Sequence, residues 1–571
     1  MKILKYYILV AVAMFMLPSC NDLDLDPLTK ASTGNWYSTA EEVKMAVNDL
    51  YRITFWQQDG DYFRTDWSDD YTYREELTDF EAATVNGQNT FVTDKWSKSY
   101  KSIARANAIL DRSGKALANE DNDAEVERYL AEARFFRAAM YTNLVTKFGA
   151  VPLVTTSLTI DQAFALGRTP VAEVQKLIYS DFDEAARVLP EAYTDEQRIT
   201  KGAALAYKAR AALYLSDWRT AAEAAKACMD LNVYKLHDDY GDLFLQSTKT
   251  SPEFIFYIPR DVNYDGYLLQ GSNVRFELPR NAGGWGACCP SWDLLASYTC
   301  TDGLPVDESP LFDPRRPFRN RDPRLSMTIV PFESEFLGYE YNPSPAATTV
   351  LNYKTGRQVT NQDCRAVASY ASYNGLVWKK GIDESWLTEG YKIEPTLVLI
   401  RYADVLLMYA EAKIELNQID QSVIDAMNRV RARAYGVDKS NTSSYPAFTI
   451  KSQKEMRREL RMERRMEFAK EHLRYQDLLR WRLMGDAMTK KGYGMLYPSS
   501  ECLKQVVKAK KWFWPIAPEV DENGIVDFSK LEDTGLIQVL SQRRWDDRQY
   551  LWPIPTKEIQ INSNMTQNPG Y

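Results

Sequence analysis

Apolar residues recur at helical spacing through several long segments of this chain. In the first segment, Ser38 and Glu41 form a capping-box pattern, and Val43, Val47 and Leu50 follow at intervals of three and four residues. Similar spacing predicts helices over residues 38–55, 91–115, 123–147, 171–188, 201–215 and 218–231. The N-terminal part of the chain is therefore expected to be a helical scaffold.

The helix pair at 201–231 has the most specific pattern. Small residues such as Ala209 and Ala211 line its first helix, and a second Ala-rich helix follows after a break. Small residues at this spacing let antiparallel helices approach closely, as in tetratricopeptide repeats. Ala410 and Ala412 match Ala209 and Ala211 at an offset of 201 positions. We expect two groups of repeat-like hairpins to pack together. Generic pairing of Ala-rich helices is the alternative, and it predicts the same all-helical class.

Between the two helical groups, residues 232–395 are rich in Gly, Pro, Tyr and Asp and carry only short helix or strand signals. A second helical group spans 395–487, and the tail 488–571 is again loop-rich. Long irregular segments on a rigid scaffold usually carry function. The predicted fold is mainly α, a TPR-like scaffold of helical hairpins with a loop-rich, ligand-binding part packed on it.

The N-terminus has the layout of a secretory signal. Lys2 and Lys5 precede an apolar run, Ile8–Leu17, that is too short for a comfortable permanent membrane span. The run ends in Leu17-Pro18-Ser19-Cys20, which resembles a bacterial lipobox, although Pro18 departs from the small residues common there. Cleavage at a lipobox leaves the cysteine first, with its sulfur carrying lipid, so Cys20 is the predicted lipidation site. A plain signal peptide with an incidental cysteine is the alternative.

Acidic residues follow Cys20 directly, at Asp22, Asp24 and Asp26. This start resembles the surface-export signal of Bacteroidetes lipoproteins, and a solvated tether is the simpler reading. Both place the chain outside the cytoplasm. Four regions are predicted: a signal peptide at 1–19, a lipid-anchored acidic tether at 20–37, an N-terminal helical part at 38–231, and a C-terminal part with loop-rich insertions at 232–571.

Composition narrows the classes of function. The formal net charge is −8, and becomes −10 once the signal with its two lysines is removed, so a duplex nucleic-acid binder is disfavoured and no nucleic-acid partner is predicted. Only His237 and His472 could supply an imidazole, so a His-ligated metal site or a catalytic triad is poorly provided for. Aromatic residues are abundant, at 12% of the chain.

Several stretches, in order along the chain, resemble one family, the SusD/RagB outer-membrane lipoproteins of Bacteroidetes. They are Glu132–Ala138 with the following residues to Leu153, Arg321–Leu325, Leu399–Ala412, Glu463–Phe468 with His472–Trp481, Leu551–Pro555, and the terminal Asn568–Tyr571. The charges in these stretches, for example Arg137, Arg401 and Asp404, lie at short helical spacings and are expected to bridge helices rather than bind ligand.

The resemblance implies four repeat-like helical hairpins, with the ligand site in the loop-rich part. It also implies capture of oligosaccharide or polysaccharide at the cell surface and its delivery to a SusC-like TonB-dependent transporter in the outer membrane, without catalysis and without a cofactor or metal. Capture of peptides, as in the RagB branch, is the alternative, and a surface glycosidase with a carboxylate pair is a further one. A fructan is the suggested glycan, because a patch formed by the adjacent Cys288 and Cys289 would suit small, flexible furanose rings, while a xylan, a glucan or a host glycan stays open.

Sugar rings present apolar C–H faces and a rim of hydroxyls, so a site for them needs flat apolar platforms beside hydrogen-bonding side chains. Residues 56–75 supply both, and 281–289 place a tryptophan among glycines. A third loop-rich segment supplies possible polar contacts from Arg357, Arg365, Tyr370 and Tyr373. The candidate ligand-binding residues are Asp59, Asp66, Trp67, Tyr71, Trp285, Cys288, Cys289, Arg357 and Tyr370. For each ring, packing under a loop is the alternative.

Adjacent Cys288 and Cys289 suggest two states. A vicinal disulfide would form a stiff, apolar, solvent-facing patch able to stack on a sugar, whereas two reduced and buried thiols would have no such role. Separately, Asp261–Gly266 match the first half of a calcium loop, but Ser272 stands where the bidentate glutamate should be. A turn is therefore expected there.

Overall fold

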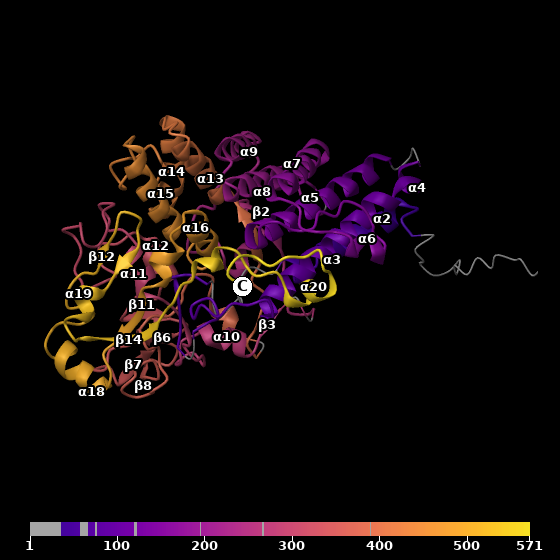
Figure 1. Cartoon of the computed structure of the whole chain (residues 1–571). Coiled ribbons are helices and arrows are strands. Elements are labelled where there is room, and N and C mark those ends of the chain that lie inside the picture. The colour runs from indigo at the N-terminus through magenta and orange to yellow at the C-terminus, as the bar shows by residue number, and fades with distance from the viewer. Residues whose placement is uncertain are drawn as a thin grey trace, which may run out of the picture.

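The computed structural model describes residues 36–56, 67–74, 77–118, 123–194, 196–264, 266, 268–388 and 390–571. The long helices form a continuous series in which each contacts the next (Figure 1). In order they are α2 (Ala40–Leu50), α3 (Thr90–Arg112), α5 (Asp123–Phe148), α7 (Val171–Val188), α8 (Lys201–Tyr214), α9 (Trp218–Asp230), α13 (Tyr402–Glu415), α14 (Gln421–Ala434) and α15 (Gln453–Glu467).

The two Ala-rich hairpins meet as predicted, because α13 packs directly against α9 and α8. Ala209 and Ala211 of α8, and Ala410 and Ala412 of α13, are all fully buried. The absence of larger side chains at these positions lets the helix axes come close. The mainly helical, hairpin-based scaffold is thus confirmed.

Two local expectations were wrong. The first helix begins one residue later than expected, because Thr39 and Glu42, rather than Ser38 and Glu41, form the capping box. Glu42 N donates to Thr39 Oγ1, and the Glu42 carboxylate accepts from Thr39 N. The second correction concerns the segment from 395, where strand β10 (Leu397–Arg401) pairs antiparallel with β2 (Phe254–Ile258) before α13 begins.

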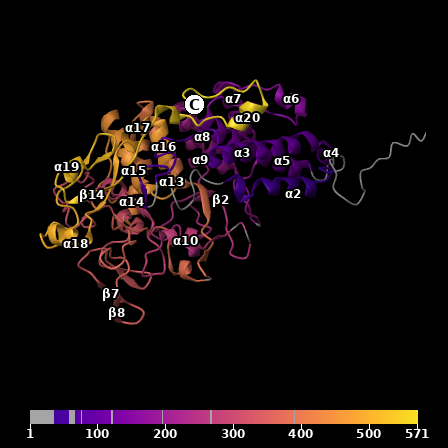
Figure 2. The ribbon, with the colours of Figure 1, turned by 60° about the horizontal axis from the view of Figure 1, so that its bottom comes forward.

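The loop-rich part gathers at one end of the helical series (Figure 2) and has its own core around Trp292, Trp378 and Trp514. Its largest sheet has four antiparallel strands in chain order, β5 (Ser334–Phe336), β6 (Tyr339–Tyr341), β7 (Thr349–Asn352) and β8 (Arg357–Thr360). The other strands form pairs: β1 (Tyr71–Tyr73) with β4 (Cys288–Pro290), β3 (Leu269–Gln270) with β9 (Lys392–Ile393), β11 (Lys491–Met495) with β14 (Ile537–Gln542), and β12 (Glu519–Val520) with β13 (Val526–Asp527).

Short helices complete the chain. They are α4 (Gly114–Leu117), α6 (Ile160–Phe164), α10 (Ser272–Glu277), α11 (Trp292–Ser297), α12 (Arg324–Thr328), α16 (Arg474–Arg480), α17 (Met484–Met488), α18 (Ser499–Glu501), α19 (Ser529–Glu532) and α20 (Thr556–Ile561). The C-terminal tail returns to the N-terminal helices, where Trp552 N donates to Lys147 O at 2.6 Å and Asn568 Nδ2 donates to Phe148 O at 3.0 Å. Among the described helices, none combines the length and the apolar character needed to cross a bilayer.

A buried ionic network joins the loop-rich part to the scaffold. Arg324 on α12 reaches Glu463 and Glu467 of α15, each at 2.9 Å. Arg401, at the end of β10, contacts Glu467 at 2.7 Å and Glu253, just before β2, at 2.6 Å. All five side chains are almost completely shielded from water. Charges so deeply buried are tolerated only when paired, so these contacts fix which elements lie together.

Glu467→Gln tests this network. The amide would leave Arg324, Arg401 and Arg433 around Glu467 without their shared negative charge. Removing one partner of a buried pair typically costs about 3–5 kcal/mol, so we expect the free energy of unfolding to fall by that order. Urea denaturation followed by tryptophan fluorescence measures it.

The matched control is Glu522→Gln. Glu522 pairs with Lys454 at 2.5 Å, but both side chains lie mostly in water, so the free energy of unfolding should stay at the wild-type value. Equal stability of the Glu467 and Glu522 variants would contradict a structural role for the buried network.

Candidate functional site

The two segments singled out for sugar recognition lie side by side in the structure. Strand β1 lies near the end of the first segment and pairs with β4 at the end of the second, with Thr72 opposite Cys289 and Tyr73 opposite Cys288. Arg74 N extends the contact by donating to Ala287 O at 3.2 Å. Residues more than 200 positions apart therefore form one two-stranded sheet.

Buried carboxylates just before β1 anchor the first segment to the scaffold. Asp69 contacts Arg465 of α15 at 3.0 Å and Arg474 of α16 at 2.9 Å, while Asp70 contacts Arg465 at 2.8 Å. Burial alone would raise the pKa of Asp69, but the two guanidinium groups hold it below its usual value. Asp69 is therefore ionised at neutral pH, and β1 starts from a fixed position.

Trp67 does not provide a sugar platform, which corrects that prediction. Its side chain is 6% exposed, and its ring centroid lies 4.8 Å from Phe80, 5.0 Å from Phe91 and 5.4 Å from Trp552. The indole is enclosed in the aromatic core between the scaffold and the C-terminal tail. No face remains for stacking on a ligand.

Tyr71, Cys288 and Cys289 are also core residues rather than ligand contacts. The Tyr71 ring, 5% exposed, packs 4.9 Å from Trp378. Both cysteines are free thiols and buried, so the solvent-facing disulfide patch does not exist in this structure. Burial raises the pKa of Cys289 to about 12, and its sulfur lies 3.4 Å from Gly286 O. These thiols support the loop that carries Trp285.

Arg74 brings Trp285 and Tyr370 together. Its Nη1 donates to Trp285 O at 2.9 Å and to Tyr370 O, so one side chain holds the backbones of two loops. The guanidinium also lies 5.4 Å from the centre of the Tyr370 ring, which is 61% exposed. Trp285 is partly buried and rests edge-on against Phe276 at 5.1 Å. This cluster is the candidate functional site.

The adjoining loop adds a second stack. The Arg365 guanidinium lies between two rings, 4.1 Å from the centre of Tyr373 and 4.5 Å from that of Tyr497. Tyr497, half exposed, comes from the C-terminal tail, and no motif in the sequence pointed to it. Arg357 is exposed on β8 opposite Asn352, and no hydrogen bond or ion pair given by the structure joins it to this cluster.

Some predicted residues cannot be placed. Cys20, Asp59 and Asp66 lie outside the described residues. At the half calcium loop, the Asp261 carboxylate accepts from Asn263 N at 2.8 Å, which is the geometry of a turn. The described residues contain no group of three or more His, Cys, Asp or Glu side chains arranged to hold a metal ion.

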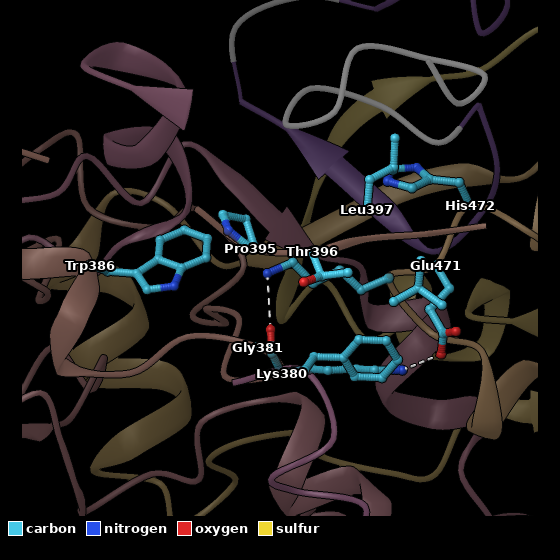
Figure 3. A pocket seen from close by; sticks show the side chains of 11 residues that line it. Lys380, Gly381, Trp386, Pro395, Thr396, Leu397, Glu471 and His472 are labelled. Atoms are coloured by element: carbon cyan, nitrogen blue, oxygen red, sulfur yellow. Dashed lines mark hydrogen bonds and ion pairs between the residues drawn. The ribbon is translucent and has the colours of Figure 1, made fainter. Parts of the chain in front are cut away.

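A pocket at the junction of scaffold and loops offers a second candidate (Figure 3). Lys380 and Glu471 lie on one side of it and Trp386 on another. Lys380 Nζ donates to Glu471 Oε1 at 2.6 Å and to Tyr240 Oη at 2.8 Å, and Glu471 also accepts from Arg401. Its charged groups already satisfy one another, so the pocket extends the buried ionic network and offers few open partners to a sugar.

Two protein-family models match this chain. The family model described as "SusD family" matches residues 252–571, more than half of the chain, and a second model described as "Starch-binding associating with outer membrane" matches residues 29–215. The chain belongs to the SusD family. Its helical scaffold falls largely within the second match, and the SusD-family match contains Trp285, Arg365 and Tyr370.

Full-length relatives share this organisation. SusD-like protein P2 of Formosa agariphila is 25% identical over an alignment covering 99% of this chain and 100% of the relative. A SusD-like carbohydrate-binding protein of Bacteroides fragilis has a crystal structure with a TM-score of 0.73 and 29% identity, covering 93% of this chain and 99% of that one. A laminarin-binding SusD-like protein has a TM-score of 0.62 at 21% identity, covering 94% of this chain and 100% of that one.

Lys380→Met tests whether burial in the pocket lowers the pKa of the Lys380 ammonium group. Burial lowers the pKa of Lys380 from 10.5 to about 8, so between these values the unfolded chain binds a proton that the folded chain does not. Wild-type stability should therefore rise, relative to the variant, as pH increases from 8 to 10.5. Urea denaturation across this range measures the difference, and a pH-independent difference would contradict the assigned titration.

Proposed function

We propose that this member of the SusD family is a non-catalytic, cell-surface glycan-binding protein that captures oligosaccharide or polysaccharide at the surface around Trp285 and Tyr370. The arrangement that carries the proposal is the grip of Arg74 on both loops, which holds a partly exposed indole near an exposed phenol. Flat rings of this kind match the apolar faces of sugar rings, and the surrounding arginines supply donors for hydroxyl groups.

Relatives support the carbohydrate assignment. The Bacteroides fragilis protein described as carbohydrate-binding is 29% identical over nearly the whole chain, and the laminarin-binding protein shares the fold. These proteins support a saccharide ligand but leave its identity open for this chain.

We further propose that the protein is held at the outer membrane by lipid on Cys20 and passes its glycan to a SusC-like TonB-dependent transporter. The lipobox-like Leu17–Cys20 sequence and the acidic residues after it support the anchor. Several acyl chains on one cysteine would give stable attachment, at about 0.8 kcal/mol per buried methylene.

Cys20→Ser tests the lipid anchor, and co-purification of the wild type tests the partnership with a transporter. The variant, expressed in a Bacteroidetes host, should leave the outer-membrane fraction, because no acyl chain can be attached through serine oxygen by the same thioether chemistry. Solubilised wild-type protein should co-purify with a TonB-dependent transporter. A membrane-bound serine variant would contradict lipid anchoring, and wild-type protein that purifies without any transporter would contradict the delivery step.

Trp285→Ala and Tyr370→Ala test the glycan surface. Each removes a ring, and loss of one stacked ring with its buried area should weaken binding about tenfold, or ~1.4 kcal/mol. Affinity electrophoresis against a panel of polysaccharides, followed by calorimetry on those that retain the protein, measures the loss.

Phe164→Ala is the matched control, since Phe164 is an exposed ring on α6 of the helical scaffold. Its affinity should equal that of the wild type. Release of shortened products from the polysaccharide would contradict the non-catalytic assignment, and retention on peptides instead of glycans would favour peptide capture.

A further inference from the structure

Three arginines beside the candidate site form no ion pair with any carboxylate of the described residues. Most buried arginines elsewhere in the described residues form ion pairs, as Arg324 and Arg401 do. By contrast, Arg275, Arg280 and Arg365 form no ion pair within the described part of the chain, and they are not among the residues with further interactions. Arg275 instead stacks on Tyr391 at 4.3 Å, and Arg365 lies between its two tyrosine rings.

Hydrogen bonds of the backbone place the segments that carry these arginines beside the Trp285 loop. Trp285 N donates to Arg275 O at 2.7 Å, which sets α10 beside the Trp285 loop. Arg280 N donates to the Asp363 carboxylate at 2.6 Å, and Asp363 lies two residues before Arg365. Asn281 Oδ1 accepts from Gln362 N at 2.7 Å. The loop at 280–289 is thus fastened to the loop at 361–375 along its length.

Carboxylates nearby are already engaged. Asp363 is buried and accepts from the backbone N–H groups of Arg280 and Asn281. Glu277, also buried, pairs with Lys470 at 2.6 Å. Meanwhile the donors Arg280 Nε, Asn281 Nδ2 and both Nε and Nη1 of Arg365 are buried and find no hydrogen-bond partner among the residues that the structure describes. Around these two loops, positive charges and hydrogen-bond donors therefore outnumber the carboxylates that could pair with them, although the chain as a whole carries a net charge of −8.

Stacked guanidinium groups suit one class of ligand. When a ring covers the guanidinium face, donation is left to the N–H groups at its edge, which form a fork that fits the paired oxygens of a carboxylate or sulfate. A neutral sugar has hydroxyl groups, which balance no charge.

We propose that the glycan held at this surface is an anionic polysaccharide, with carboxylate or sulfate groups paired to Arg275, Arg280 and Arg365 while its rings lie on Trp285 and Tyr370. This inference rests on the proposed glycan-binding function. It favours an acidic chain over the neutral fructan suggested from the cysteine pair. The attraction is local, since it acts between groups in contact, and it weakens as salt screens it.

Paired polymers test the inference by affinity electrophoresis with the mature protein. In the uronate arm the anionic polymers are polygalacturonate, alginate and a glucuronate polymer, and the neutral counterpart is carboxyl-reduced polygalacturonate. In the sulfate arm the anionic polymers are dextran sulfate, chondroitin sulfate and carrageenan, and the neutral counterpart is dextran. Laminarin, inulin and xylan are the other neutral polymers. We expect retention by at least one anionic polymer, weakened by added NaCl, with little retention by its neutral counterpart. The arm that retains the protein identifies the anionic group.

Arginine variants then locate the contact. Arg365→Gln combined with Arg280→Gln should weaken binding to the retaining anionic polymer at least about tenfold. Arg275→Gln removes a guanidinium that stacks on the Tyr391 ring, and it should weaken binding several-fold without disturbing the fold. Arg187→Gln, on the exposed face of α7, is the matched control. Circular dichroism and thermal melting verify that each variant is folded.

The outcomes separate the two proposals. Retention by neutral polymers that Trp285→Ala abolishes but the arginine variants leave unchanged would overturn the anionic assignment and keep glycan binding. Anionic retention unaffected in every folded arginine variant would also overturn it. Failure of all the polymers to retain the wild type would contradict the proposed function itself.

Discussion

Arginine and carboxylate groups removed from water must find each other, and this requirement determines how the two parts of the molecule join. Arg324, Arg401 and Glu467 come from three separate segments and meet where almost no solvent reaches them. Replacing such a cluster with apolar side chains of equal volume is often neutral for stability, so its value here lies in specificity. Any other arrangement of these segments would leave an unpaired charge in the interior.

The same pairing extends to the candidate site. Arg465 belongs to α15, the helix that carries Glu463 and Glu467, and it holds Asp69 and Asp70 at the start of β1. From there the strand runs only a few residues before Arg74 contacts the two recognition loops. A continuous series of contacts therefore connects the buried ion pairs to the exposed rings. Loops with little regular structure acquire defined positions because their ends are fixed by buried charges.

The sequence was sufficient to predict the scaffold because helical periodicity is a local property. Segments 171–188 and 201–215 match α7 and α8 almost residue for residue, and the matching alanines identified the second hairpin. The capping box shifted by one residue because two overlapping patterns compete at 38–42, and only backbone geometry separates them. The family, too, was visible in the order of its motifs.

Burial of individual aromatic rings was not predictable in this way. Trp67 occurs among polar residues and Trp285 among glycines, yet only the first meets Phe80, Phe91 and Trp552, which are brought to it from other parts of the chain. The segments around β1 and β4 were identified correctly, but their pairing required long-range contacts. Tyr497 was missed for the same reason, since its neighbour Arg365 lies over a hundred positions away in sequence.

Arg74 holds its two loops through carbonyl oxygens, which every amino acid possesses. The side chains at 285 and 370 are therefore free to vary without loosening the frame that presents them. Evolution could exchange a ring for an amide or a smaller group at either position and retune the preferred nutrient, while a change at position 74 would remove the frame itself. Among close homologues, the residues at positions 285 and 370 should then vary, whereas the arginine at position 74 should be retained.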